Sequence, residues 1–173
     1  MCLGMTNLLS SSQVPASSGT MLHLCSSPRT ALATAPFRTR VLIAFGLGCL
    51  SALAFAPFYL WPLFFAAIGG LVWLIDTSTS SSRCAALGWS FGFGYFIFGL
   101  SWLSIAFQSQ ILMPVWLGYF AVVGLGAVLA MYQALAFWAS HRLWSRSSAR
   151  ILTVAAFWGI AEWLRGDLLT GFP

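Results

Sequence analysis

Residues 41–75 read VLIAFGLGCLSALAFAPFYLWPLFFAAIGGLVWLI, a run of 35 residues without a charged side chain. One helix needs about 20 residues to cross the hydrocarbon core of a bilayer, so this run is too long for a single crossing. Pro57 and Pro62 stand near its middle, where proline interrupts a helix and favours a turn. We therefore predict a helical hairpin within a membrane, with transmembrane segments at about 41–57 and 60–75.

The composition of the whole chain also indicates a membrane protein. Hydrophobic residues make up 60% of the 173 residues and charged residues only 6%, too few to cover the surface of a soluble domain. Eight Arg and no Lys stand against Asp76, Glu162 and Asp167, which gives a net charge of +5. Because the Arg cluster outside the apolar runs and form no continuous basic face, we expect no binding to nucleic acid.

Three further apolar segments follow the hairpin. The uncharged run 85–107 contains Gly88 and Gly92 at GxxxG spacing, which lets another helix approach closely. The run 111–139 is also uncharged, and Pro114 suits the first turn of a helix. The last run is short and must extend into flanking residues whose Arg side chains reach the interface. The prediction is an all-α integral membrane bundle of about five transmembrane helices, the last three at about 85–107, 113–139 and 149–165.

The Arg residues predict the orientation of this bundle. They precede the first segment, follow the second and follow the fourth, whereas the two alternate loops carry none. Cytoplasmic loops are the ones enriched in Arg, so the pattern places the N-terminus in the cytoplasm. The Arg concerned are Arg38, Arg40, Arg83, Arg142, Arg146 and Arg150.

Residues 1–40 differ from the membrane region at 41–173. They are rich in Ser, Thr, Pro and Ala, contain no acidic residue and show no periodic apolar face, which predicts a disordered polar leader. The same composition is typical of an organelle transit peptide, and it also arises when a reading frame is started too far upstream, for example before Met21. The mis-assigned start is the simpler of these two interpretations.

The cysteines and histidines form no pattern typical of a metal site or a disulfide framework. The four cysteines lie far apart without CxxC or Cys/His spacing, so each is interpreted as a small apolar side chain. His141 has no nucleophile or metal ligand among its sequence neighbours and is interpreted as an interfacial loop residue. We expect no metal and no cofactor. The cysteines are Cys2, Cys25, Cys49 and Cys84.

Glu162 and Arg165 are the candidate site residues. They stand three apart on one helical face, close enough to form an ion pair that lowers the cost of a carboxylate at membrane depth. Arg165 could meet a phospholipid phosphate or help to seat a domain at the outer surface, or the pair could be purely structural and hold the end of the helix.

Trp61, Trp102 and Trp163, near the predicted outer ends, are typical of an interfacial aromatic belt. Trp138 and Trp144, at the cytoplasmic end, have the same interpretation.

Five short motifs carry a family resemblance. In this order and spacing they resemble the N-terminal membrane region of the apolipoprotein N-acyltransferases, over about residues 38–173. The motifs are FAPF at 55–58, LWP at 60–62, LSWL at 100–103, EWLRG at 162–166 and LTGFP at 169–173.

The resemblance implies an enzyme of the bacterial inner membrane. Members of this family move a fatty acyl chain from a membrane phospholipid, the donor, to the S-diacylglyceryl cysteine of an apolipoprotein, the acceptor, in the last step of lipoprotein maturation. Their nitrilase-like periplasmic domain supplies a Cys nucleophile, a Glu base and a Lys. This chain contains no Lys and a single Glu, and none of its four cysteines lies in a matching motif. We therefore expect a fragment that has no catalytic residue and is inactive alone.

The alternative is a complete small non-enzymatic multi-span membrane protein, such as a transporter subunit or an assembly factor. A transporter requires polar groups near the middle of the membrane. The first four predicted segments contain no charge and few amides beyond Gln133, which gives this alternative little support. A decayed gene whose product has no function is a third possibility.

Overall fold

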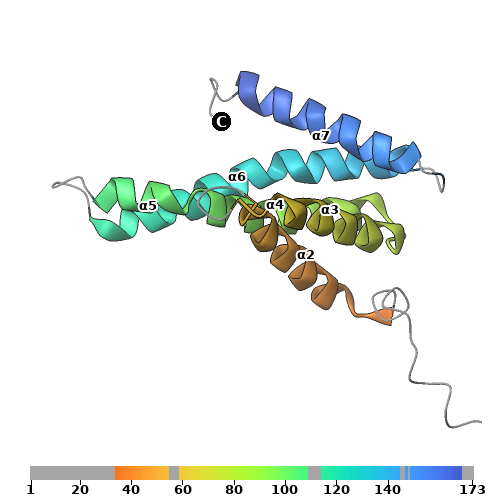
Figure 1. The fold of residues 1–173 in the computed structure, drawn as a ribbon, viewed down its shortest axis with the longest axis horizontal. Helices are drawn as coiled ribbons and strands as arrows, with labels where there is room; N and C mark the ends of the chain where they lie inside the picture. The colour runs from red at the N-terminus through yellow and green to blue at the C-terminus, as the bar shows by residue number, and fades with distance from the viewer. Residues whose placement is uncertain (1–33, 55–58, 109–113, 145–146, 148, 169–173) are drawn as a thin grey trace, which may run out of the picture.

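The computed structural model describes residues 34–54, 59–108, 114–144, 147 and 149–168, and the regular elements in these ranges are α-helices (Figure 1). The all-α prediction is confirmed. One stretch, Trp116–Arg142, is long and apolar enough to cross a membrane, and the helix Trp61–Asp76 is apolar but shorter. The number of membrane crossings therefore stays a prediction. The helices are α2 (Phe37–Ala52), α3 (Trp61–Asp76), α4 (Ser81–Gly99), α5 (Ser101–Gln108), α6 (Val115–Arg142) and α7 (Ala149–Leu168).

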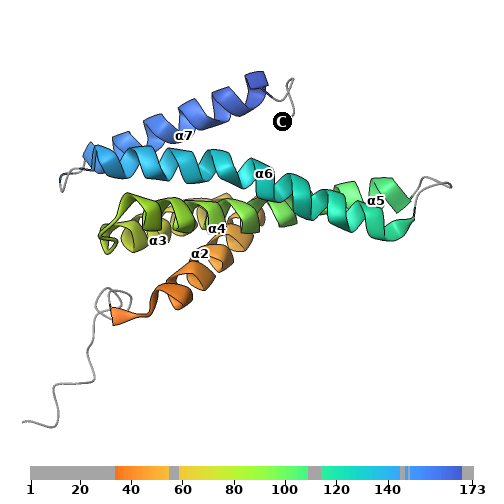
Figure 2. The same cartoon turned by 180° about the vertical axis from the view of Figure 1, so that it is seen from behind.

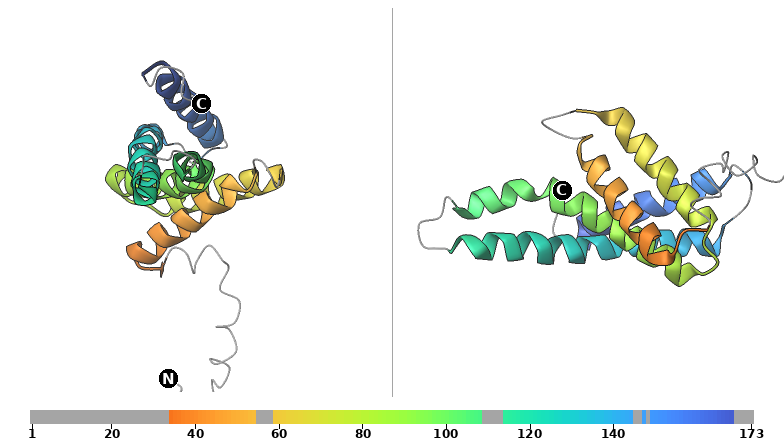
Figure 3. Two further views of the ribbon diagram at one scale, coloured as in Figure 1. Left: turned by 90° about the vertical axis from the view of Figure 1, so that its left-hand side faces the viewer. Right: turned by 90° about the horizontal axis from the view of Figure 1, so that it is seen from below.

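Helix α4 lies at the centre of the molecule. It packs against α2 on one side and α6 on the other, while α3 packs on α2 and α7 covers another part of α6 (Figures 1 and 3). Phe91 of α4, Leu74 of α3 and Phe137 of α6 are fully buried in the main core. A second cluster around Phe96 and Leu129 continues the contact between α4 and α6. The close packing of these large side chains supplies van der Waals contacts that hold the helices together.

Glycines make the contact between α4 and α6 close. A Cβ atom on Gly88 would come within 2.7 Å of the Phe137 ring, and one on Gly92 would come within 3.0 Å of the Gln133 side chain. Neither position has room for a larger residue unless α6 moves. The packing role predicted from the spacing of Gly88 and Gly92 is confirmed.

Helices α2 and α4 approach each other even more closely. A Cβ atom on Gly48 would collide with the backbone oxygen of Phe91, and one on Gly94 would collide with that of Phe45. Near this contact, the Ser90 hydroxyl donates a hydrogen bond to the carbonyl oxygen of Val41 at 2.9 Å. Backbone therefore meets backbone at this crossing, a geometry that only glycine permits.

The segment predicted at 85–107 is divided into α4 and α5. Leu100 departs from helical geometry with φ −96° and ψ 5°, and its N–H donates to the carbonyl oxygen of Phe96 at 2.8 Å. Gly99 precedes this break, and a Cβ atom there would meet nothing within 4 Å. Glycine has a low helix propensity, which favours an interruption of the helix axis at this point.

The predicted hairpin has the expected order of helices with shifted ends. α2 begins at Phe37, so the last four residues of the predicted leader 1–40 belong to a helix. Residues 1–33 of that leader and Pro57 lie outside the described residues. Pro62 occupies the first turn of α3, where its missing N–H costs no hydrogen bond. Before it, Tyr59 has a positive φ of 54°, a conformation that L residues rarely adopt.

Candidate functional site

The start of α2, the loop between α3 and α4, the end of α6 and the start of α7 lie at the same end of the bundle (Figure 2). Arg40 is only 5% exposed there, and its Nη2 donates to the carbonyl oxygen of Leu74 at 2.6 Å. The same nitrogen donates to Thr77 Oγ1 at 2.5 Å and Ser78 Oγ at 2.8 Å. The C-terminus of a helix carries partial negative charge, so Arg40 stabilises the end of α3. Burial lowers the pKa of Arg40 from its ordinary value.

Asp76 connects the end of α3 to the start of α7. Its carboxylate accepts two hydrogen bonds from Arg150 Nη1, at 3.0 and 2.8 Å, and one from Trp144 Nε1 at 3.0 Å. Trp144 therefore has a specific partner in addition to its predicted place in an aromatic belt. His141 Nδ1 lies 3.0 Å from Ser81 Oγ, which links α6 to α4. These contacts join the loops that the sequence predicted to share the cytoplasmic side.

Glu162 lies in a second polar cluster, formed between α4, α6 and α7. Its Oε2 pairs with Arg165 Nη2 at 2.5 Å, as the spacing of the two residues predicted. Its Oε1 accepts a hydrogen bond from Gln133 Nε2 at 2.7 Å. The Arg165 guanidinium lies over the Phe96 ring, 5.4 Å from its centroid. We call Gln133, Glu162, Arg165 and Phe96 the Glu162 network.

The Glu162 network is largely removed from the surface. The Arg165 side chain is 14% exposed, the Glu162 side chain is 30% exposed, and Gln133 is fully buried. Gln133 Oε1 and Arg165 Nε have no hydrogen-bond partner among the described residues. A carboxylate, an amide and a guanidinium can position helices or bind a polar group, and none of the three is a thiol or hydroxyl nucleophile.

The sequence foresaw only part of this network. It indicated the pair on α7, because residues three apart on a helix share a face. It did not indicate that Gln133 of α6 contacts the carboxylate, although a lone amide in an uncharged apolar run is itself a signal that a polar partner is needed. The partner could not be identified before the packing of α6 against α7 was known.

Two cysteines and three tryptophans singled out in the sequence also lie in the part of the chain that the structure describes. Cys49 and Cys84 are free thiols, half-buried and buried respectively. In the described ranges, no three His, Cys, Asp or Glu residues come together as metal ligands would. Trp61, Trp102 and Trp163 are all more than half exposed, as residues facing lipid or headgroups would be.

Comparisons with known proteins identify the family. The model described as the apolipoprotein N-acyltransferase N-terminal domain matches residues 47–173. The apolipoprotein N-acyltransferase of Rhodopseudomonas palustris is 46% identical over 139 residues, which cover 78% of this chain and 26% of that protein. Those of Bradyrhizobium diazoefficiens and Sinorhizobium fredii are 44% and 42% identical, with 78% of this chain and 26% and 27% of theirs covered. The chain thus spans about a quarter of the length of the curated relatives it matches, and it belongs to the apolipoprotein N-acyltransferase family.

Proposed function

We propose that this chain forms the N-terminal membrane region of an enzyme that transfers a fatty acyl chain from a phospholipid to the N-terminal S-diacylglyceryl cysteine of apolipoproteins. The observation that carries the proposal is the 46% identity to the Rhodopseudomonas palustris protein of that name. The region would hold the catalytic domain at the outer surface and admit lipid between its helices. The chemistry would belong to residues that this chain does not contain.

The proposal includes a place and an orientation. The region crosses the bacterial inner membrane about five times, and its N-terminus lies in the cytoplasm. This is supported by the charged residues that meet at one end of the bundle, namely Arg40 at the end of α3 and the pair of Asp76 with Arg150. It is also supported by α6, in which the 27-residue stretch Trp116–Arg142 is long and apolar enough to cross a membrane.

A chimera tests the main proposal. Residues 41–173 would replace the first quarter of the Rhodopseudomonas palustris protein, with the same protein lacking that quarter as the control. We expect the chimera to N-acylate a diacylglyceryl peptide in phospholipid vesicles, and the control to be inactive. A chimera that inserts into the membrane and shows no acylation would contradict the proposed equivalence.

The isolated chain provides the second half of this test. We expect the 173-residue polypeptide alone to leave the diacylglyceryl peptide unmodified, because it contains no Lys and its single Glu lies in the Glu162 network. The product is followed by the mass of the added acyl chain. Turnover by the isolated chain would refute the claim that the catalytic residues lie elsewhere.

We further propose that Glu162 and Arg165 are positioning residues that hold α7 against α6 and α4. Two contacts support this role. The Glu162 carboxylate accepts a hydrogen bond from Gln133, and the Arg165 guanidinium lies over the Phe96 ring, so both charged groups have partners inside the bundle. The alternative is direct contact between Arg165 and a phospholipid phosphate or a domain at the outer surface. Both roles make Arg165→Gln harmful, so activity alone does not separate them.

The separation comes from two measurements on the chimera. If Arg165 is a positioning residue, Arg165→Gln lowers the melting temperature and kcat and leaves KM for the donor phospholipid unchanged. Glu162→Gln keeps an oxygen for Gln133 and loses the charge, and it should give a smaller change of the same kind. A rise in KM for the donor with an unchanged melting temperature would instead assign Arg165 to the phosphate.

A further inference from the structure

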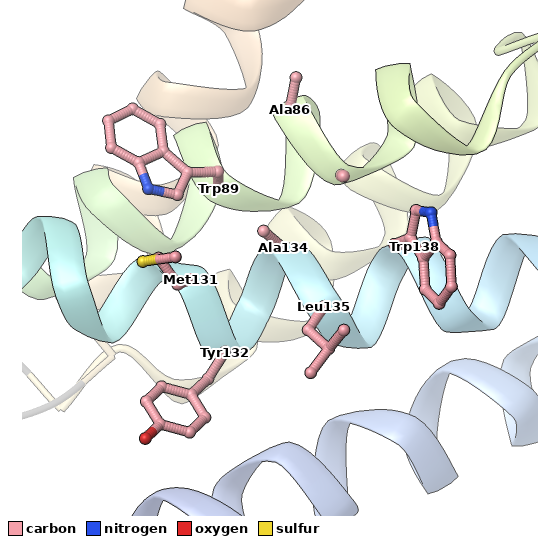
Figure 4. Close-up of a pocket in the computed structure, with 8 residues that line it drawn as sticks. Ala86, Trp89, Met131, Tyr132, Ala134, Leu135 and Trp138 are labelled. Atoms are coloured by element: carbon pink, nitrogen blue, oxygen red, sulfur yellow. The ribbon is translucent and has the colours of Figure 1, made fainter.

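A groove of about 620 Å³ opens between α4 and α6 (Figure 4). Its lining includes the small side chains of Ala86 and Ala134, and Met131 and Leu135 line it with 62% and 53% of their surfaces exposed. Trp89 and Trp138 also line the groove, toward its two ends in Figure 4. The lining is almost entirely apolar, so an occupant would have to be apolar along this length.

The groove is separate from the Glu162 network. Met131, Leu135 and Trp138 recur at spacings of four and three and so share one face of α6. Gln133 and Phe137 lie roughly on the opposite face by the 3.6-residue period of a helix. Those two residues contact α7, through Glu162 and Trp158. The groove residues Met131, Leu135 and Trp138 therefore lie on a different face of α6 from Gln133 and Phe137.

A cation lies at one end of the groove. The Arg142 guanidinium is 4.6 Å from the centroid of the Trp138 ring. Arg142 is exposed, and within the described residues the ion pairs are made by Arg150 and Arg165, not by Arg142. A positive charge at the end of an apolar slot is complementary to a molecule with an apolar chain and an anionic head.

We propose that the groove binds an anionic phospholipid of the cytoplasmic leaflet, with one acyl chain along α4 and α6 and the phosphate on Arg142. The proposal rests on the proposed membrane orientation, which places Arg142 at the cytoplasmic surface. It goes beyond the proposed function, because this lipid is bound at the end of the bundle away from the outer surface and is not consumed. Its role is to occupy the groove, where the side chains of α4 and α6 leave space between them.

The test uses the 173-residue chain in nanodiscs made of equal parts of phosphatidylglycerol and phosphatidylethanolamine. Lipids that stay bound are counted by native mass spectrometry after release from the nanodisc. The variant is Arg142→Gln, and the matched control is Arg38→Gln, which removes the same charge from an exposed position on α2. We expect the unchanged chain and the control to retain phosphatidylglycerol in preference to phosphatidylethanolamine. Arg142→Gln should lower this preference about five-fold, and Arg142→Lys should restore most of it.

A second variant tests the apolar part of the site. Ala134→Phe places a large ring at the lining of the groove and leaves every charge in place, and it should reduce retained phosphatidylglycerol while the helical circular dichroism stays unchanged. Equal retention by Arg142→Gln and Arg38→Gln, or no preference for the anionic lipid in the unchanged chain, would overturn the proposal. Neither result depends on acyl transfer, so failure here is distinct from failure of the proposed function.

Discussion

Arg40 lies at the start of α2 with its guanidinium buried against the last turn of α3. Composition and spacing assigned it to a row of topology signals, together with Arg38. The two residues differ in the structure, since Arg38 is exposed and Arg40 is 5% exposed. Because its partners are the carbonyl oxygen of Leu74 and two hydroxyls, Arg40 ties α2 to α3 without needing a carboxylate.

Replacement of Arg40 should therefore destabilise the fold far more than replacement of Arg38. We expect Arg40→Ala to lower the free energy of unfolding by about 2 kcal/mol, the usual scale for buried hydrogen bonds to a charged group. Arg38→Ala should change it by less than about 0.5 kcal/mol. Both are measured by denaturant unfolding in detergent micelles, and equal effects would show that the contact of Arg40 with α3 contributes nothing.

Cys84 lies just before the apolar segment 85–107 and is fully buried. Burial raises the pKa of its thiol to about 11, against smaller opposing effects of Ser78 and Arg40. At neutral pH the thiol should be protonated and unreactive, with a thiolate fraction about 100-fold below that of a thiol with the ordinary value. A variant that retains Cys84 as its only cysteine should react slowly with iodoacetamide when folded and rapidly in denaturant.

The pH dependence of this thiol has a definite sign. The folded state holds the proton above pH 9, where an unfolded chain begins to lose it, so this group's contribution to stability is complete below about pH 9. The contribution declines as the pH rises toward about 11. Rapid alkylation of the folded chain at pH 7 would contradict both the burial and the raised pKa.

At the scale of the helices, apolar runs predicted where the helices lie but not how they end or meet. The run 111–139 corresponds to α6. In contrast, α4 and α5 are separated at Leu100, inside the run 85–107 that is uncharged throughout. Hydropathy does not record this break, because all of the residues around it except Ser101 remain apolar or small. The break depends on local backbone geometry after Gly99.

The crossing of α2 and α4 provides a matched pair of glycines. Gly48→Ala would drive a Cβ atom into the backbone oxygen of Phe91, whereas Gly46→Ala would meet nothing within 4 Å. We expect Gly48→Ala to destabilise the protein by about 1–3 kcal/mol through overpacking. Gly46→Ala should stabilise it by up to about 1 kcal/mol through helix propensity.

Thermal unfolding of the two variants, followed by circular dichroism, checks this prediction. The substitutions are chemically identical and lie two residues apart on one helix, so differences in detergent binding should be small. If Gly48→Ala were as stable as Gly46→Ala, α2 and α4 would not be in backbone contact.

At the scale of the whole molecule, residues far apart in the chain meet at the end of the bundle that contains Arg40 and Arg150. Asp76 and Arg150 are separated by 74 positions and pair at 2.8 Å. Each side chain is about a quarter exposed, so this pair contributes only about 0.2–1 kcal/mol to stability. Its importance is in joining α3 to α7, which brings two predicted cytoplasmic loops together.

The proposed orientation makes a prediction for cells. In a background without cysteine, Tyr59→Cys lies in a predicted outer loop and Ser147→Cys in a predicted cytoplasmic loop. A membrane-impermeant maleimide should label Tyr59→Cys in intact spheroplasts and Ser147→Cys only after the membrane is permeabilised. The reverse result would invert the orientation, and labelling of both in intact spheroplasts would place the two loops on the same side.

The sequence by itself determined the all-helical class, the family and the pairing of Glu162 with Arg165, because composition, motif order and helical spacing are local properties of the chain. Only the tertiary structure decided that Gln133 binds Glu162 and that Arg40 binds the last turn of α3. It also decided that Arg142 lies at one end of the groove between α4 and α6. These contacts depend on which faces of separate helices meet. That choice is made by packing around glycines and buried aromatic rings, and it is not encoded in the spacing of residues within any one segment.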